Sequence, residues 1–144
     1  MDISQLRQQH EDISRTAGQL ARAIATQNGP QGVGAIRWQL ARQLIAHLAL
    51  EDRILYPSLH RDGSSQVRAT ALMLQEDTGA LAEQFSRYMA AWSDDRVARE
   101  WPAFCGATRL ILQTLTERVD REERTLYPLA EALKSDGGRI ARTG

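Results

Sequence analysis

A histidine and a glutamate lie one helical turn apart in the stretch 44–57, LIAHLALEDRILYP, on a face that is otherwise apolar. These residues are His47 and Glu51, and residues at spacings of three and four share one face of a helix. Imidazole nitrogens and carboxylate oxygens are the usual ligands of iron, manganese and zinc in helical bundles. Because buried charges must be paired or must hold a metal, this pair predicts an ionic or a metal site in the core.

A second stretch repeats the first. In 118–128, RVDREERTLYP, Glu122 precedes a Leu-Tyr-Pro sequence as Glu51 does. The repeat fails at one position, because Arg118 occupies the place that corresponds to His47. This self-similarity predicts two helix pairs related by a pseudo-twofold axis.

Two further ionisable residues interrupt apolar faces, His10 near the amino terminus and Asp77 in the middle of the chain. His10 lies 20 residues before Pro30 and Glu51 lies 21 after it, so a hairpin at Pro30 brings them level. A lone histidine on an apolar face is more often a hydrogen-bonded core residue than a ligand. Here, however, such residues recur on the apolar faces of four predicted helices, which would pack these faces together. We therefore predict one interior layer of six polar residues, namely His10, His47, Glu51, Asp77, Arg118 and Glu122.

The helical periodicity predicts four long amphipathic helices, which argues for an all-α, up-down-up-down antiparallel four-helix bundle. The expected helices cover about 3–27, 35–60, 64–92 and 93–133, with Ser64 or Ser65 and Ser93 as caps. The last helix either includes Pro102 in its first turns or begins near Trp101, because an interior proline breaks a helix. We expect one domain over 1–136 and a flexible tail over 137–144.

Composition excludes several classes of partner. Eighteen basic and eighteen acidic residues leave no net charge, so neither a nucleic acid nor an anionic membrane surface is expected to bind. The sequence has no signal-peptide pattern and no apolar run of the ~20 residues that a membrane span needs. The single cysteine, Cys105, agrees with a reducing compartment, and we expect a cytoplasmic protein. No nucleophile constellation or phosphate-binding loop indicates catalysis.

With these residues the chain resembles the hemerythrin-like proteins, whose domain is also called the HHE cation-binding domain. The resemblance covers nearly the whole chain, and it implies that four helices supply histidines and two bridging carboxylates to a pair of irons. The chain matches this pattern at His10, His47, Glu51 and Glu122. It departs where the third helix has Asp77, with Glu76 as a rival for that position, and where the fourth helix has Arg118.

The resemblance therefore implies half of a two-iron site. Arginine has no lone pair to donate to a metal, so Arg118 is expected to occupy the place of the second ion. Three carboxylates and one guanidinium leave a charge of minus two, which one divalent metal would neutralise. Iron is the expected metal, with zinc and manganese as alternatives, and the implied role is sensing of dioxygen, nitric oxide or iron.

The alternative needs no metal. Protonation of His10 and His47 also brings the charge of the layer to zero and produces a buried salt-bridge network. Such a chain would be a degenerate hemerythrin-like bundle that acts as a signalling or protein-interaction module, with a protein partner or a second copy of itself. The two interpretations differ in metal content.

Overall fold

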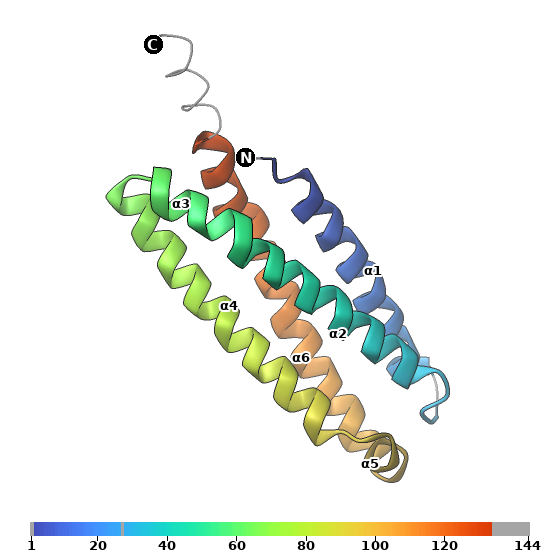
Figure 1. The fold of residues 1–144 in the computed structure, drawn as a ribbon. Coiled ribbons are helices and arrows are strands. Elements are labelled where there is room, and N and C mark those ends of the chain that lie inside the picture. The colour runs from blue at the N-terminus through green and yellow to red at the C-terminus, as the bar shows by residue number, and fades with distance from the viewer. Residues whose placement is uncertain (1, 27, 134–144) are drawn as a thin grey trace, which may run out of the picture.

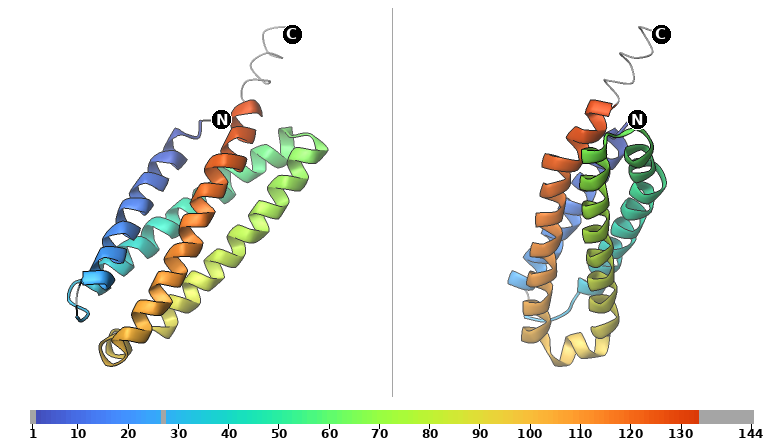
Figure 2. Two further views of the ribbon diagram at one scale, coloured as in Figure 1. Left: turned by 180° about the vertical axis from the view of Figure 1, so that it is seen from behind. Right: turned by 90° about the vertical axis from the view of Figure 1, so that its left-hand side faces the viewer.

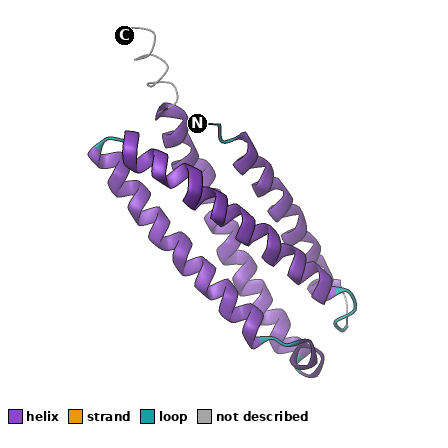
Figure 3. Cartoon of the chain, viewed as in Figure 1, coloured by secondary structure: helices purple, strands orange, loops and turns teal. Residues whose placement is uncertain are grey.

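The computed structural model describes residues 2–26 and 28–133, and every regular element in that part of the chain is helical (Figures 1 and 3). The predicted tail over 137–144 lies outside the described residues. The elements in chain order are α1 (Ser4–Thr26), α2 (Val33–Leu50), the π-helix η1 (Glu51–Leu55), α3 (Tyr56–Asp62), α4 (Ser65–Ala91), α5 (Asp94–Arg99), α6 (Trp101–Arg121) and the π-helix η2 (Glu122–Leu126), followed by α-helix over 127–133.

These elements form four long helical rods that lie side by side as a helical bundle (Figure 2). α1 and α4 are rods by themselves. The second rod joins α2, η1 and α3 without a break, and the fourth joins α6, η2 and residues 127–133. α1 packs against α2 and α6, and α4 packs against α3 and α6. Within the described ranges, no helix is long and apolar enough to cross a membrane.

α4, α5 and α6 begin where the sequence predicts a cap or a proline in the first turn, whereas α2 begins at Val33, two residues before the expected 35. The Ser64 hydroxyl accepts a hydrogen bond from the Val67 amide at 3.2 Å and caps α4. The Ser93 hydroxyl caps the short α5 in the same way, through the Arg96 amide at 3.2 Å. α6 then begins at Trp101 with Pro102 in its first turn, where the missing amide hydrogen costs nothing.

The π turns η1 and η2 were not predicted. They occupy equivalent positions in the internal repeat, and each begins at the glutamate of its copy. The Tyr56 amide donates to the Glu51 carbonyl and the Tyr127 amide donates to the Glu122 carbonyl, five residues earlier in each case. Because the widened turn contains an extra residue, each glutamate and the tyrosine that follows it are both buried in the bundle interior.

The core consists of two apolar clusters with charged residues between them. On α1, Leu6 belongs to one cluster and Ile13 to the other. Leu44 and Leu50 divide in the same way on the second rod. The buried side chains between the clusters, which we call the polar layer, are His10, His47, Glu51, Thr78, Arg118 and Glu122.

Candidate metal centre

Four ligand-type side chains meet in the polar layer. One ligand atom from each residue lies within 4.8 Å of all the others, and the set is His10 from α1, His47 from α2, Glu51 from η1 and Glu122 from η2. Their exposed fractions are between 0 and 3%, so water does not screen their charges. Three of the four helical rods therefore contribute ligand-type groups to one enclosed point.

The inner contacts join nitrogen and oxygen atoms at short range. His10 Nε2 lies 2.7 Å from Glu122 Oε1, and His47 Nε2 lies 3.3 Å from that same oxygen. His47 Nε2 also lies 3.1 Å from Glu51 Oε2. The two imidazole rings have centroids 4.5 Å apart, so both rings approach the carboxylates from neighbouring directions.

The outer nitrogen of each imidazole has a hydrogen-bond acceptor of its own. His10 Nδ1 donates to Glu123 Oε1 at 2.9 Å, and His47 Nδ1 donates to the amide oxygen of Gln9 at 2.8 Å. Arg7 Nε in turn donates to Glu123 Oε2 at 3.2 Å. These bonds fix the tautomer, because a neutral imidazole that donates from Nδ1 presents Nε2 as a lone pair.

A neutral layer is therefore chemically unsatisfactory, since lone pairs on nitrogen would face carboxylate oxygens at hydrogen-bond distance. Either a proton or a metal cation must lie between them. In the metal-free chain, burial by itself would lower the pKa of His47, but hydrogen bonds to Glu122 and Glu51 and their charges raise it to about 9. Burial raises the pKa of Glu51, whereas hydrogen bonds from His10 and His47 overcome burial and lower that of Glu122.

Arg118 lies in the polar layer, with 7% of its side chain exposed. Its Nη2 donates to the Leu74 carbonyl and the Thr78 hydroxyl, and Nε lies 3.6 Å from Glu122 Oε2. Arg118 was expected to pair with the carboxylates of the layer, and it does pair with Glu122. Its Nη1 lies farther from Asp77, at 3.9 Å from Oδ2. The guanidinium is bound mainly to neutral groups of α4.

The prediction that Asp77 lies in the interior layer is wrong. Its side chain is 46% exposed and accepts a hydrogen bond from Arg121 at 2.8 Å on the surface. Thr78 occupies the buried position instead, because the apolar face of α4 advances four residues from Leu74 to Thr78 rather than three. Glu76 is also exposed, so neither acidic candidate from α4 enters the layer.

This correction changes the charge count. With Asp77 at the surface, the buried fixed charges are those of Glu51, Glu122 and Arg118, which sum to minus one when the histidines are neutral. The sequence-based count was minus two. One divalent metal would therefore leave the layer with a charge of plus one.

A tyrosine also reaches the cluster. The Tyr127 hydroxyl lies 3.1 Å from His10 Nε2 and 3.4 Å from His47 Nε2, and it donates to Glu51 Oε2 at 3.2 Å. Burial, followed by the charges of Glu122 and Glu51, raises the pKa of Tyr127 far above its ordinary value. The sequence signal was the repeated Leu-Tyr-Pro after each glutamate, but its significance depends on the π turns.

The residues fit one metal ion. Two imidazole nitrogens and two carboxylates form a mixed nitrogen and oxygen donor set suited to iron, manganese or zinc. In the described part of the chain, Glu51 Oε1 and Glu122 Oε2 are buried without a hydrogen-bond partner, so each carboxylate has further capacity to bind a cation. Among the described residues, no second donor set of this kind lies beside Arg118 and Thr78, as a second ion would need.

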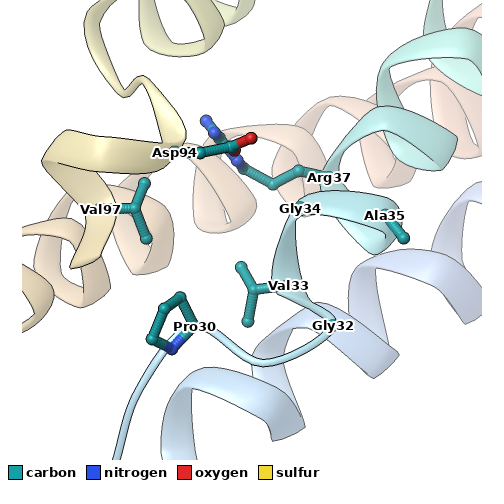
Figure 4. A pocket seen from close by; sticks show the side chains of 8 residues that line it. All are labelled: Pro30, Gly32, Val33, Gly34, Ala35, Arg37, Asp94 and Val97. Carbon is teal, nitrogen blue, oxygen red and sulfur yellow. The ribbon is translucent and has the colours of Figure 1, made fainter.

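A separate pocket lies at the α5 end of the bundle (Figure 4). Its charged lining residues are Arg37 and Asp94. Arg37 is 2% exposed, donates to the Trp92 carbonyl at 2.6 Å and lies over the Tyr88 ring. These contacts within the core explain why its guanidinium is buried. The pocket therefore has no metal-ligating cluster.

Comparison with known proteins agrees with the geometry. Neither the curated proteins nor the solved structures contain a match to this chain. The family model described as the hemerythrin HHE cation-binding domain matches residues 1–130. That match covers most of the chain, including all four residues of the cluster. The chain belongs to the hemerythrin HHE cation-binding domain family.

Proposed function

We propose that this protein binds one divalent metal ion per chain through His10, His47, Glu51 and Glu122. The observation that carries the proposal is the contact of two imidazole Nε2 atoms with carboxylate oxygens, at 2.7 to 3.3 Å, inside an enclosed core. The outer hydrogen bonds of both rings hold Nδ1 protonated, which is how histidine ligands are normally oriented. Iron is the proposed metal, and zinc and manganese are the alternatives.

A single ion, rather than two, follows from the residues on the other side of the layer. Arg118 and Thr78 lie there, and a permanently protonated guanidinium repels a second cation. The predicted up-down-up-down topology is part of this proposal. It is supported by the internal repeat and by the short links after Asp62 and Ala91.

The proposed role is metal-dependent sensing or regulation in the cytoplasm, with dioxygen, nitric oxide or the metal itself as the signal. The enclosed core supports this role because a metal there is shielded from bulk water, which would otherwise compete with a small neutral ligand. A buried and unpaired Cys105 agrees with a reducing compartment.

A second candidate is a metal-free signalling or protein-interaction module. The raised pKa of His47 favours it, because a protonated imidazole also satisfies the carboxylates. An exposed apolar surface on α2 would then serve a protein partner or a second copy of the chain. Trp38 and Ile45, which are 54% and 67% exposed, supply that surface.

Histidine variants test the proposal, because the chain has only three histidines and the third is a control. Metal-free protein without a histidine tag is titrated with Fe²⁺ under anaerobic conditions and, separately, with Zn²⁺. His10→Ala and His47→Ala are expected to weaken binding at least tenfold. His60→Ala is expected to bind like the parent, because His60 contacts Gln75 at 3.1 Å, outside the polar layer. Equal binding by all three variants would contradict the proposed site.

A further inference from the structure

The Tyr127 hydroxyl is the only side-chain hydroxyl at the centre of the four-residue cluster, among the described residues. The Tyr127 side chain is completely buried, and its oxygen lies 3.1 to 3.4 Å from three atoms of three cluster residues. Those three atoms, His10 Nε2, His47 Nε2 and Glu51 Oε2, are also the ones that would face a metal. A cation close to all three would therefore also be close to the phenolic oxygen.

Hydrogen bonding alone does not account for this position. A phenol has one hydrogen to donate, and it is directed to Glu51 Oε2. In the state that binds a metal both histidines are neutral and donate outward from Nδ1, so each Nε2 atom has a lone pair and donates no hydrogen bond to the phenolic oxygen. The phenolic oxygen is thus surrounded by more acceptors than its single hydrogen can satisfy.

The charge of the layer also favours an additional anion beside the metal. Glu51, Glu122 and Arg118 sum to minus one, so a divalent metal with neutral histidines leaves plus one in a medium that penalises unbalanced charge. Glu123 lies outside the layer with 34% of its side chain exposed, so water screens its charge, and it pairs with Arg7, which also contacts Glu131. Asp77 is likewise paired with Arg121 at the surface. One additional anion inside the layer would neutralise it.

We propose that Tyr127 is a fifth ligand of the metal and binds it as a phenolate. This inference rests on the proposed function. When a divalent ion binds, the phenolic O–H bond breaks, the oxygen keeps the electron pair and bonds to the metal, and the proton passes to solvent. No oxidation state changes, so the step needs no further reactant.

The internal repeat supplies a matched control in Tyr56. Tyr56 occupies the equivalent position after η1 and is equally buried, but its hydroxyl faces the other side of the layer. It lies 3.4 Å from Thr78 Oγ1 and accepts from Arg118 Nη2 at 3.5 Å. Each tyrosine thus accompanies one cation, and for Tyr56 that cation is the guanidinium.

The test uses Zn²⁺, which has no redox chemistry and no visible absorption. Zn²⁺ is added to the metal-free full chain, and the ultraviolet difference spectrum is recorded for tyrosinate formation. The parent and Tyr56→Phe are expected to form one tyrosinate per bound ion, and Tyr127→Phe none. Binding of Zn²⁺ by Tyr127→Phe is expected to weaken about tenfold or more. With Fe³⁺, the parent and Tyr56→Phe are expected to show phenolate-to-iron absorption that Tyr127→Phe lacks.

The outcomes separate the two proposals. One bound Zn²⁺ per parent chain without a tyrosinate signal would overturn the role of Tyr127 and leave the four-residue site intact. An unchanged tyrosinate signal in Tyr127→Phe would overturn it too. No Zn²⁺ or iron binding by the parent would overturn both proposals. If Tyr127→Phe folds poorly, the parent and Tyr56→Phe still test the proposal, because a missing tyrosinate signal in either would overturn it.

Discussion

At the scale of single residues, the polar layer differs from a two-metal site because Arg118 and Thr78 occupy the side that has no histidines. Arg118 brings a permanent positive charge into the polar layer, and its Nη2 is held by the Leu74 carbonyl and the Thr78 hydroxyl. Its Nε lies 3.6 Å from Glu122 Oε2, a carboxylate oxygen that accepts no hydrogen bond from the described residues. Arg118 is therefore the nearest fixed counter-charge of Glu122.

Arg118→Met is predicted to destabilise the metal-free protein by about 3 to 5 kcal/mol, because it leaves Glu122 buried without that counter-charge. Arg121→Met is the matched control. Arg121 is 55% exposed, and its pair with Asp77 is expected to contribute about 0 to 1 kcal/mol. Urea unfolding of both variants measures the difference. If Arg118→Met unfolded at the urea concentration of the parent, Arg118 would not be compensating Glu122.

The stability of the metal-free protein is predicted to fall as pH rises from about 6.5 to 9. The pKa of His47 is about 9 in the folded chain against an ordinary 6.5, so its protonation stabilises the fold fully below 6.5 and not above 9. The raised pKa of Glu51 acts in the same direction at lower pH. The change in the pKa of His47 from 6.5 to about 9 limits this loss to about 3 to 4 kcal/mol.

Thermal unfolding at several pH values measures this loss, and saturating Zn²⁺ provides the contrast. Metal binding displaces the proton from His47, so the affinity for Zn²⁺ should increase over the same pH range. A metal-free protein with constant stability between these pH values would mean that His47 stays neutral in the fold.

At the scale of elements, two π turns and the helix boundaries place the site. η1 and η2 begin at Glu51 and Glu122, and each buries a glutamate and the following tyrosine in one helix. The link between α3 and α4 is equally constrained. A Cβ on Gly63 would lie 2.5 Å from the Leu59 carbonyl and 2.6 Å from Val67 Cγ1.

Gly63→Ala and Gly79→Ala are predicted to change stability in opposite directions. A methyl group on Gly63 would collide with backbone, so this variant should be destabilised by about 1 to 3 kcal/mol. Gly79 lies within α4 with open space around it, so alanine should stabilise the protein by about 0.5 to 1 kcal/mol. Chemical denaturation measures both, and a destabilised Gly79→Ala would show that this face of α4 is covered in solution.

The sequence predicted the helical rods, their caps and most of the polar layer, because apolar residues at spacings of three and four define one face reliably. It misplaced Asp77 because Leu74 is followed on the buried face by Thr78, and a spacing of four is indistinguishable from three by polarity alone. It did not decide between packing and a hydrogen bond to the site for Tyr127, because a regular α-helix does not bury residues five apart on one face. A π turn does, and nothing in local composition predicted one.

At the scale of the whole molecule, the polar layer divides the core into two apolar clusters and limits how the rods can pair. The layer has one half with imidazoles and one half with Arg118 and Thr78. Because the chain repeats itself, its second helix pair keeps the glutamate, the π turn and the tyrosine of the first pair, as Glu122, η2 and Tyr127. Only the imidazole positions differ.

Arg118→His combined with Thr78→His is predicted to raise metal binding from one to two ions per chain. The substitutions place imidazoles at the two buried positions that lack them and remove the guanidinium charge. Arg118→His with Asp77→His is the control, since position 77 faces solvent and should not complete a second site. Elemental analysis of both variants counts the ions, and equal counts would contradict the assignment of position 78.

The metal-to-chain ratio of the parent protein shows directly whether the polar layer holds one metal ion. The full chain is produced without a histidine tag, supplied with iron, freed of loosely bound ions and subjected to elemental analysis alongside His10→Ala. We expect one ion per parent chain and a ratio near zero for His10→Ala, because His10 belongs to the four-residue cluster and its Nε2 lies 2.7 Å from Glu122 Oε1. Two ions per parent chain would contradict the role of Arg118, and a ratio near zero in the parent would contradict the metal site itself.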